Sequence, residues 1–261
     1  MEAVVNHASD RVKRFLQGVQ DFSLLSYQAF ANLFSPPRYW RDTIDQMDAI
    51  GVGSLTIVSL TGLFTGMVLA LQSSATLDAF GARAYVGRLV ALSMIRELGP
   101  VLSSLMVAGR VGSGMAAELG SMAVTQQIDA MRALGTDPYR KLVTPRMVAG
   151  VIMMPLLTII SDAVGLLGGY LISYYSLRLG TQFYWRSAAD AIQIQDLFMG
   201  LAKPLFFGYL VAAVGCFQGL ATSGGTRGVG QSTTRSVVMA SVLILASDYF
   251  LTNLILYYVY P

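Results

Sequence analysis

Long apolar stretches alternate with shorter polar segments along the whole chain. Five stretches reach the length of about 20 residues that a helix needs to cross a bilayer, namely residues 49–77, 85–111, 147–177, 197–222 and 237–259. The first contains no charged residue. The charged residues inside the other four are Arg88, Arg96, Glu97, Asp162, Lys203 and Asp248, with Arg110 at the end of the second stretch. The pattern predicts five transmembrane helices, with a polar loop at residues 178–196 between the third and the fourth.

The segment before the first span, residues 12–34, has a helical period of its own. Its apolar residues fall on one face of a helix, opposite the polar ones; they include Phe15, Val19, Phe22, Ala29, Phe30 and Leu33. Such a helix can lie in the plane of the membrane interface or pack against the spans, and the pattern leaves both interpretations open. The sequence Ser35-Pro36-Pro37 predicts where this helix ends.

Composition narrows the class of protein. Hydrophobic residues make up 54% of the 261 residues and charged residues 13%, about half the charged share of a soluble domain. This excludes a disordered chain and an ordinary soluble enzyme, and a net charge of +3 is too small to indicate nucleic-acid binding. We expect an all-α polytopic membrane protein that forms a single domain over residues 1–261.

Basic residues are unevenly divided between the two sides that five spans define. Most lie in the N-terminal segment, in the region 110–146 and in the loop with Arg227 and Arg235, whereas the other side carries Arg83, Arg88, Arg178 and Arg186. Loops rich in Lys and Arg stay in the cytoplasm. The distribution predicts a cytoplasmic N-terminus and 110–146 region, and a C-terminus outside the cytoplasm.

The sequence offers no motif for chemistry on a substrate. It contains no G-x-x-x-x-G-K-[ST] phosphate loop, no G-x-S-x-G and no H-E-x-x-H. Its one histidine, His7, cannot build a catalytic triad, and its one cysteine, Cys216, excludes an intramolecular disulfide and a cysteine-rich metal site. We therefore expect no catalytic residue, no metal site and no cofactor.

The segment 116–138 is too polar to span a membrane and has the features of an amphipathic helix. Val124, Ile128, Met131 and Leu134 recur at helical spacing among polar residues. Gly135-Thr-Asp-Pro138 predicts a helix stop followed by a turn. A short helix of this kind at the tip of a cytoplasmic loop can dock into a groove of a soluble partner. It can equally lie against the inner leaflet.

Several short motifs in order carry a resemblance that covers about residues 40–255. They are Arg96-Glu-Leu-Gly-Pro100, Ala108-Gly-Arg-Val-Gly112, Ala117-Glu-Leu-Gly120, Gln126-Gln-Ile-Asp-Ala130, Leu134-Gly-Thr-Asp-Pro138, Leu142-Val-Thr-Pro-Arg146 and Thr233-Thr-Arg-Ser-Val237. With them the chain resembles the MlaE/YrbE permease family, the membrane subunits of ABC lipid transporters associated with MCE proteins. The predicted five spans agree with the architecture of that family, which adds an N-terminal interfacial helix.

The resemblance implies partners and a mechanism. A homodimer of permeases in the bacterial inner membrane would move phospholipid or a related lipid to or from a periplasmic MCE-domain protein. A cytoplasmic ABC ATPase subunit would supply the energy, which explains why the chain lacks a phosphate loop. Segment 116–138 would be the coupling segment that docks on the ATPase, with contact or supporting residues Glu118, Gly120, Ile128, Asp129, Met131, Leu134 and Gly135.

Arg96 and Glu97 are adjacent charges within the second span, where each is costly to insert. Neighbours in a helix point about 100° apart, so at least one of them needs a partner elsewhere. They can form structural ion pairs, or they can line a wet, outward-facing cavity and contact a lipid head group. The family resemblance places acyl-chain contacts at the outer end of the first span, at Leu69, Gln72, Leu77 and Phe80.

Two other functions fit the intramembrane charges. An ion-coupled secondary transporter could use Arg96, Glu97, Asp162 and Asp248, and a membrane scaffold would need none of them for transport. Asp162, Lys203 and Asp248 could pair with one another inside the bundle, or Lys203 could extend its ammonium group to the outer interface. The lipid class and the direction of transport stay open at this stage.

Overall fold

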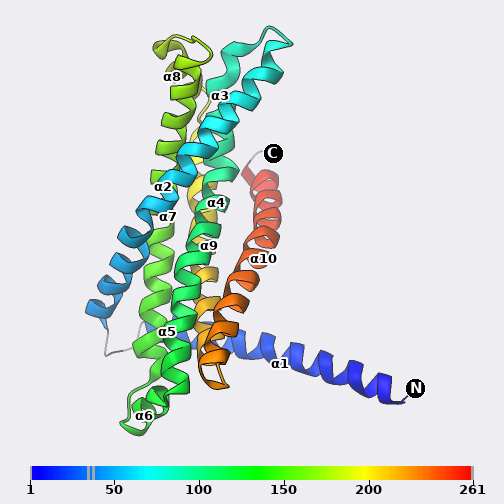
Figure 1. Cartoon of the computed structure of the whole chain (residues 1–261), viewed down its shortest axis with the longest axis vertical. Coiled ribbons are helices and arrows are strands. Elements are labelled where there is room, and N and C mark those ends of the chain that lie inside the picture. The colour runs from blue at the N-terminus through cyan, green and yellow to red at the C-terminus, as the bar shows by residue number, and fades with distance from the viewer. Residues whose placement is uncertain (1, 34–35, 37–38, 260–261) are drawn as a thin grey trace.

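A computed structural model describes the chain except for residues 1, 34–35, 37–38 and 260–261. Within the described residues the chain is helical and contains no strand. Its long helices run roughly along one axis, with the short helix α8 (Thr181–Ala189) at one end and the short helix α6 (Gln127–Ala133) at the other (Figure 1). These two ends are called the α8 end and the α6 end below.

Five helical segments of the described chain are long and apolar enough to cross a membrane. They are α2 (Trp40–Asp78), a second segment at Arg83–Val124, a third at Tyr139–Tyr175 that contains α7 (Thr144–Tyr175), α9 (Ile194–Leu220) and α10 (Gly225–Val259). This confirms the prediction of an all-α polytopic membrane protein. Most of these helices extend beyond the apolar stretches that predicted them; α2, for example, begins nine residues before Ala49.

The helix α1 (Glu2–Leu33) runs across the long axis at the α6 end, and its N-terminal part projects away from the bundle (Figure 1). Its C-terminal part packs on the bundle through the buried residues Leu25 and Ala29. Tyr209 on α9 donates a hydrogen bond of 2.7 Å to Ser26 and lies against the ring of Phe30. One half of α1 therefore packs on the spans, while the projecting half has the direction that an interfacial helix would take.

Helices α2 and α7 approach each other until their backbones touch. A Cβ atom added at Gly66 would overlap the carbonyl oxygen of Gly165, and one added at Gly168 would overlap the carbonyl oxygen of Leu63. The same holds for Gly62 against Ser161. Two G-x-x-x-G patterns of the sequence, 62–66 and 165–169, thus meet along one contact, as small residues allow in membrane helices.

The second span is not a regular α-helix. It consists of a 3₁₀ turn at Arg83–Tyr85, the α-helices α3 (Val86–Ser93), α4 (Gly99–Val107) and α5 (Ser113–Val124), and π-helical turns at Met94–Leu98 and Ala108–Gly112. Turns of π-helix inside α-helices are rare and often mark functional sites. The first of them contains Arg96 and Glu97, and Pro100 is the second residue of α4, which follows it.

The predicted 116–138 segment is divided between two structures. Its first part belongs to α5, which continues the second span to Val124, and a break at Gln126 with a positive φ of 59° separates α5 from α6. Val124 and Ile128 therefore do not share one helix, and the protruding part is shorter than the pattern predicted. A third π-helical turn, Tyr139–Val143, leads into α7.

Candidate functional site

A buried lysine joins three of the membrane-spanning helices. The side chain of Lys203 on α9 is fully buried. Its ammonium nitrogen lies 2.6 Å from Glu97 Oε2 in the second span and 3.0 Å from Asp248 Oδ1 on α10. Thr252, one turn beyond Asp248, donates a hydrogen bond of 3.2 Å to Glu97 Oε1. Since Lys203 points into the bundle, it does not extend to the interface.

Lys203 also bonds to a backbone group. Its ammonium donates a hydrogen bond of 3.0 Å to the carbonyl oxygen of Arg96. In an uninterrupted α-helix the amide of residue 100 would donate to this carbonyl, but Pro100 has no amide hydrogen. The lysine thus supplies a donor where the proline has none. Its ammonium donates hydrogen bonds to this carbonyl and to Glu97, and its contact with Asp248 is an ion pair without hydrogen-bond geometry.

Arg96 belongs to a second ion pair on the same helices. Its Nε atom lies 2.6 Å from Oδ1 of Asp196, whose side chain is fully buried. Oδ2 of Asp196 accepts a hydrogen bond of 2.9 Å from the amide of Gln193 and completes a capping box at the start of α9. Both adjacent charges of the second span are therefore paired with other helices, Arg96 with the first turn of α9 and Glu97 with Lys203.

Asp162 of α7 lies apart from this network. Its carboxylate contacts Gly99, where an added Cβ atom would overlap Oδ1. This oxygen is buried and has no hydrogen-bond partner among the described residues. The sequence suggested Asp162, Lys203 and Asp248 as mutual partners. Lys203 and Asp248 do form an ion pair. Among the described residues, Asp162 forms an ion pair with neither of them.

An open groove of about 320 Å³ runs along α2 next to this network. Leu69 and Gln72 line it, together with Phe64, Thr65, Val68 and Leu98. Leu98 directly follows Glu97 in the chain, but no charged residue of the network lines the groove. The side chains of Arg96 and Glu97 are 31% and 38% exposed.

Leu77 and Phe80, also predicted to contact acyl chains, do not line this groove. Leu77 packs against a small core of Ala70, Val86 and Val90 near the α8 end. Phe80 lies in the turn after α2 and is 80% exposed. The structure thus brings Leu69 and Gln72 together in one groove, which Arg96 and Glu97 do not line, and places Leu77 and Phe80 farther towards the α8 end.

At the other end of the bundle, Glu118 and Gly120 stabilise the chain's own packing. Glu118 of α5 lies 2.8 Å from Arg146 of α7, whose side chain is only 4% exposed. A Cβ atom added at Gly120 would lie 2.8 Å from the hydroxyl of Thr222, just beyond α9. Both residues hold α5 against its neighbours, which supports the position of α6 without placing either residue on the tip.

The protruding helix α6 exposes most of its surface. Ile128 is buried and anchors it, whereas Asp129 pairs with Arg132 at 3.0 Å on the exposed side. Met131 is half-buried, and Leu134 is 84% exposed. Gly135 has a φ of +77°, which ends the helix in the left-handed conformation that glycine adopts without strain. An exposed leucine at the tip of a helical hairpin is a candidate contact for another protein.

Comparison with known proteins decides the family. The family of the permease MlaE matches residues 43–254. A protein of Rickettsia felis named "Probable ABC transporter permease protein" is 42% identical over 251 residues, which are 96% of this chain and 97% of that protein. This chain belongs to the MlaE permease family.

Two other relatives show how widely this MlaE-family sequence is shared. One is the "Intermembrane phospholipid transport system permease protein MlaE" of Haemophilus influenzae, 36% identical over 253 residues, or 95% of this chain and 97% of that protein. The other is the "Protein TRIGALACTOSYLDIACYLGLYCEROL 1, chloroplastic" of Arabidopsis thaliana, 35% identical over 230 residues, or 88% of this chain and 66% of that protein. The resemblance seen in the sequence motifs is thereby confirmed.

Two members of the charge network in this MlaE-family chain were missed by sequence reasoning. Asp196 falls in the region read as the polar loop 178–196, although its position three residues after Gln193 and before an apolar run is a helix-start signal. Thr252 lies four residues after Asp248, on the same helix face. The helix-start signal at Asp196 and the spacing of Thr252 can both be found in the sequence, but neither predicts which residue the side chain contacts.

Proposed function

We propose that this chain is the permease subunit of an ABC transporter that moves phospholipid, or a related lipid, between the bacterial inner membrane and a periplasmic MCE-domain protein. A separate ATPase subunit supplies the energy. The observation that carries the proposal is α6, an exposed helix at the tip of a hairpin between two spans, on a chain without a nucleotide-binding motif. The names of the Rickettsia and Haemophilus relatives support the same assignment.

The geometry of α6 fits a coupling element. The exposed Leu134, which follows its last residue, offers an apolar contact, and Ile128 and the Glu118–Arg146 pair tie the hairpin to the bundle. A helix held in this way transmits a rigid-body movement of a docked ATPase to the second and third spans. The α6 end is then cytoplasmic and the α8 end periplasmic, which agrees with the distribution of Lys and Arg.

The lipid would be handled near the charge network, in the groove lined by Leu69 and Gln72. The apolar walls suit acyl chains, and the partly exposed Arg96 and Glu97 suit a head group. Because Lys203 and Asp196 tie the first π-helical turn to α9, a movement of the second span changes the surroundings of the head group. Two such permeases, paired as a homodimer, would enclose the groove between them.

The decisive experiment is purification of the tagged chain from its native membrane in mild detergent. A co-purifying P-loop ATPase is expected, and ATP-dependent lipid transfer in proteoliposomes should require both subunits. Leu134→Ser should release the ATPase, because it removes the exposed apolar contact of α6. Phe80→Ser is the matched control, since Phe80 is equally exposed at the opposite end of the bundle, and it should leave the ATPase bound.

The alternatives predict different results in the same preparation. An ion-coupled transporter would move lipid by itself when an ion gradient is imposed and ATP is absent. A scaffold would leave lipid transfer unchanged when Arg96 and Glu97 are both replaced by glutamine. Recovery of the chain without any ATPase from mild detergent would contradict the proposal directly.

A further inference from the structure

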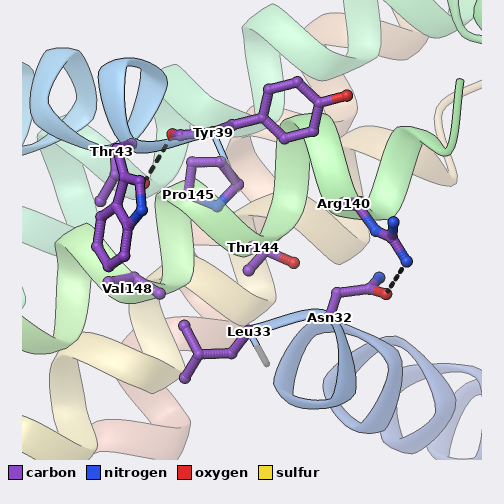
Figure 2. A pocket seen from close by; sticks show the side chains of 9 residues that line it. Asn32, Leu33, Tyr39, Thr43, Arg140, Thr144, Pro145 and Val148 are labelled. Atoms are coloured by element: carbon purple, nitrogen blue, oxygen red, sulfur yellow. Dashed lines mark hydrogen bonds between the residues drawn. The ribbon is translucent and has the colours of Figure 1, made fainter. Parts of the chain in front are cut away.

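A crevice at the α6 end lies where the end of α1, the start of α2 and the start of α7 meet (Figure 2). It consists of two adjoining cavities that share Leu33, Thr144 and Val148, one of about 40 Å³ and one of about 130 Å³. The smaller cavity has polar groups at its margin and the larger is apolar. The crevice lies at the opposite end of the molecule from the Leu77 cluster and outside the groove proposed for transport.

The larger cavity is lined by apolar side chains of α1, α7 and α9. They include Phe30, Met147, Val151 and Ile152, and the ring of Tyr209. No charged residue lines it. Met147 is the first residue of the apolar stretch predicted as the third span, so the cavity follows the first apolar turns of α7. It therefore lies at the depth where acyl chains begin, if the α6 end reaches the membrane surface as the proposed function requires.

The guanidinium group of Arg140 stands at the polar margin of the smaller cavity (Figure 2). It donates hydrogen bonds of 2.6 Å to the carbonyl oxygen of Pro36 and 3.4 Å to Asn32 Oδ1. Its Nε atom is buried and has no hydrogen-bond partner among the described residues. The side-chain amide of Asn32 in turn donates a hydrogen bond of 3.4 Å to Asp137. The carboxylate of this small network is therefore linked to Arg140 only through Asn32.

Arg140 differs from the neighbouring basic residues in having no ion-pair partner among the described residues. Lys141 is paired with Asp42, and Arg146 is paired with Glu118. In the part of the chain that the structure describes, no carboxylate lies within 4.0 Å of Arg140 as an ion-pair partner. A cation with a buried, unused donor beside an apolar cavity is complementary to a ligand that combines an anion with a hydrocarbon chain.

Two aromatic residues lie on the α2 side of the same crevice. Tyr39 and Trp40 both line it, and Trp40 is 60% exposed. Tyrosine and tryptophan are enriched at the membrane–water boundary, where their rings meet head groups. Their position next to Arg140 puts the polar margin of the crevice at the level of lipid phosphates and the apolar cavity below it.

We infer that this crevice binds a phospholipid of the leaflet at the α6 end, with its phosphate at Arg140 and one acyl chain between α1 and α7. The site is separate from the transport groove and rests on the proposed orientation of the chain in the membrane. The bound lipid fills the contact between α1 and α7 and holds the projecting helix against the bundle. The ligand is a resident lipid, recognised through its phosphate, and not a lipid in transit.

The test uses the full chain in nanodiscs that contain a phosphatidylglycerol probe with a photoactivatable diazirine on its acyl chain. Cross-linked peptides are identified by mass spectrometry. Wild-type protein should be labelled between Met147 and Ile152. Arg140→Gln should lower this labelling about tenfold, the loss expected for a hydrogen bond to a charged group. Arg132→Gln, the same change at the same end, should leave it unchanged.

Three further arms make the result decisive. Val148→Trp fills the shared wall of the two cavities and should abolish labelling, whereas Ile159→Trp on the exposed side of α7 should not. Arg140→Lys keeps the charge and should keep most of the labelling, which separates loss of charge from misfolding. A diacylglycerol probe without phosphate should label poorly. Equal labelling by both probes, or an unchanged signal in Arg140→Gln, would overturn the site. The labelling experiments involve neither the ATPase nor transport. A negative result for the lipid site is therefore distinct from a failure of the proposed function.

Discussion

Lys203 donates a hydrogen bond of 3.0 Å to the backbone carbonyl of Arg96, to which Pro100 has no amide hydrogen to donate. This contact links an irregularity of the second span to a charge on α9. The same ammonium forms ion pairs with Glu97 and Asp248, so one side chain contacts an irregular turn of the second span and two carboxylates. The π-helical turn is therefore held by long-range contacts, and its geometry depends on α9 and α10.

The first prediction concerns this lysine. Lys203→Met should lower the free energy of unfolding by about 3–5 kcal/mol, because it leaves two carboxylates and a carbonyl without their partner. Unfolding in mixed micelles, followed by the fluorescence of Trp40 and Trp185, measures the change. Lipid transfer should fall with it, since the turn that carries Arg96 loses its anchor.

A double variant distinguishes lost pairing from lost packing. Lys203→Met combined with Asp248→Leu removes both an unpaired carboxylate and its former partner, and it should regain part of the stability lost in the single variant. Wild-type stability of Lys203→Met alone would mean that the network contributes nothing to the fold.

The second prediction separates the two roles of Asp196. Asp196→Asn keeps an oxygen for the amide of Gln193 but loses the charge that faces Arg96, whereas Asp196→Ala loses both. The alanine variant should be less stable than the asparagine variant by about 0.5–2 kcal/mol, the contribution of a helix cap. Thermal unfolding of the two proteins in the same detergent gives the comparison, and equal midpoints would show that the cap is not needed.

The sequence allowed the spans to be predicted well and the ends of the helices poorly, for one physical reason. Apolar patterning reports where hydrocarbon surrounds a helix, and hydrogen bonding continues the helix into water until a breaker interrupts it. Helix α2 thus begins at Trp40 and not near Ala49, and α5 continues to Val124 through residues expected in the separate segment 116–138. The break at Gln126 has no strong local signal, because its left-handed φ occurs without glycine.

For a related reason, the sequence allowed the charged residues of the candidate site to be found but not their partners. Charges inside apolar stretches identify themselves, so Arg96, Glu97, Lys203 and Asp248 stand out in the sequence. Which of them pair depends on how the helices cross, and that is fixed by contacts such as Gly66 on Gly165, between helices that carry none of these four charges. Asp196 is buried by the fold although its sequence surroundings are those of a loop.

The third prediction tests the close contact of α2 and α7. Gly66→Ala places a methyl group where the carbonyl oxygen of Gly165 lies, so the helices must separate. Overpacking of this kind costs about 1–3 kcal/mol, and the midpoint of thermal unfolding should fall. Gly114→Ala is the matched control, because no atom lies within 4 Å of an added Cβ there. A loss of stability in Gly114→Ala and none in Gly66→Ala would contradict the packing described.

The fourth prediction concerns the end of α6, where Gly135 closes a Schellman motif. The amide of Thr136 donates to the carbonyl of Met131, and that of Gly135 to the carbonyl of Arg132, each at 3.0 Å. Gly135→Ala should destabilise this turn by about 1–2 kcal/mol, because its φ of +77° is strained for alanine. A seven-residue helix has little stability of its own, so the amide of Thr136 should exchange its hydrogen about 5–30 times faster. Gly135→Asn, which tolerates this φ, should exchange more slowly than the alanine variant. So local a change should leave global unfolding unaffected, and ATPase binding then tests the proposed coupling role. Binding of the ATPase should weaken in the alanine variant and recover in the asparagine variant. Equal binding by both variants would show that the ATPase does not depend on an ordered α6.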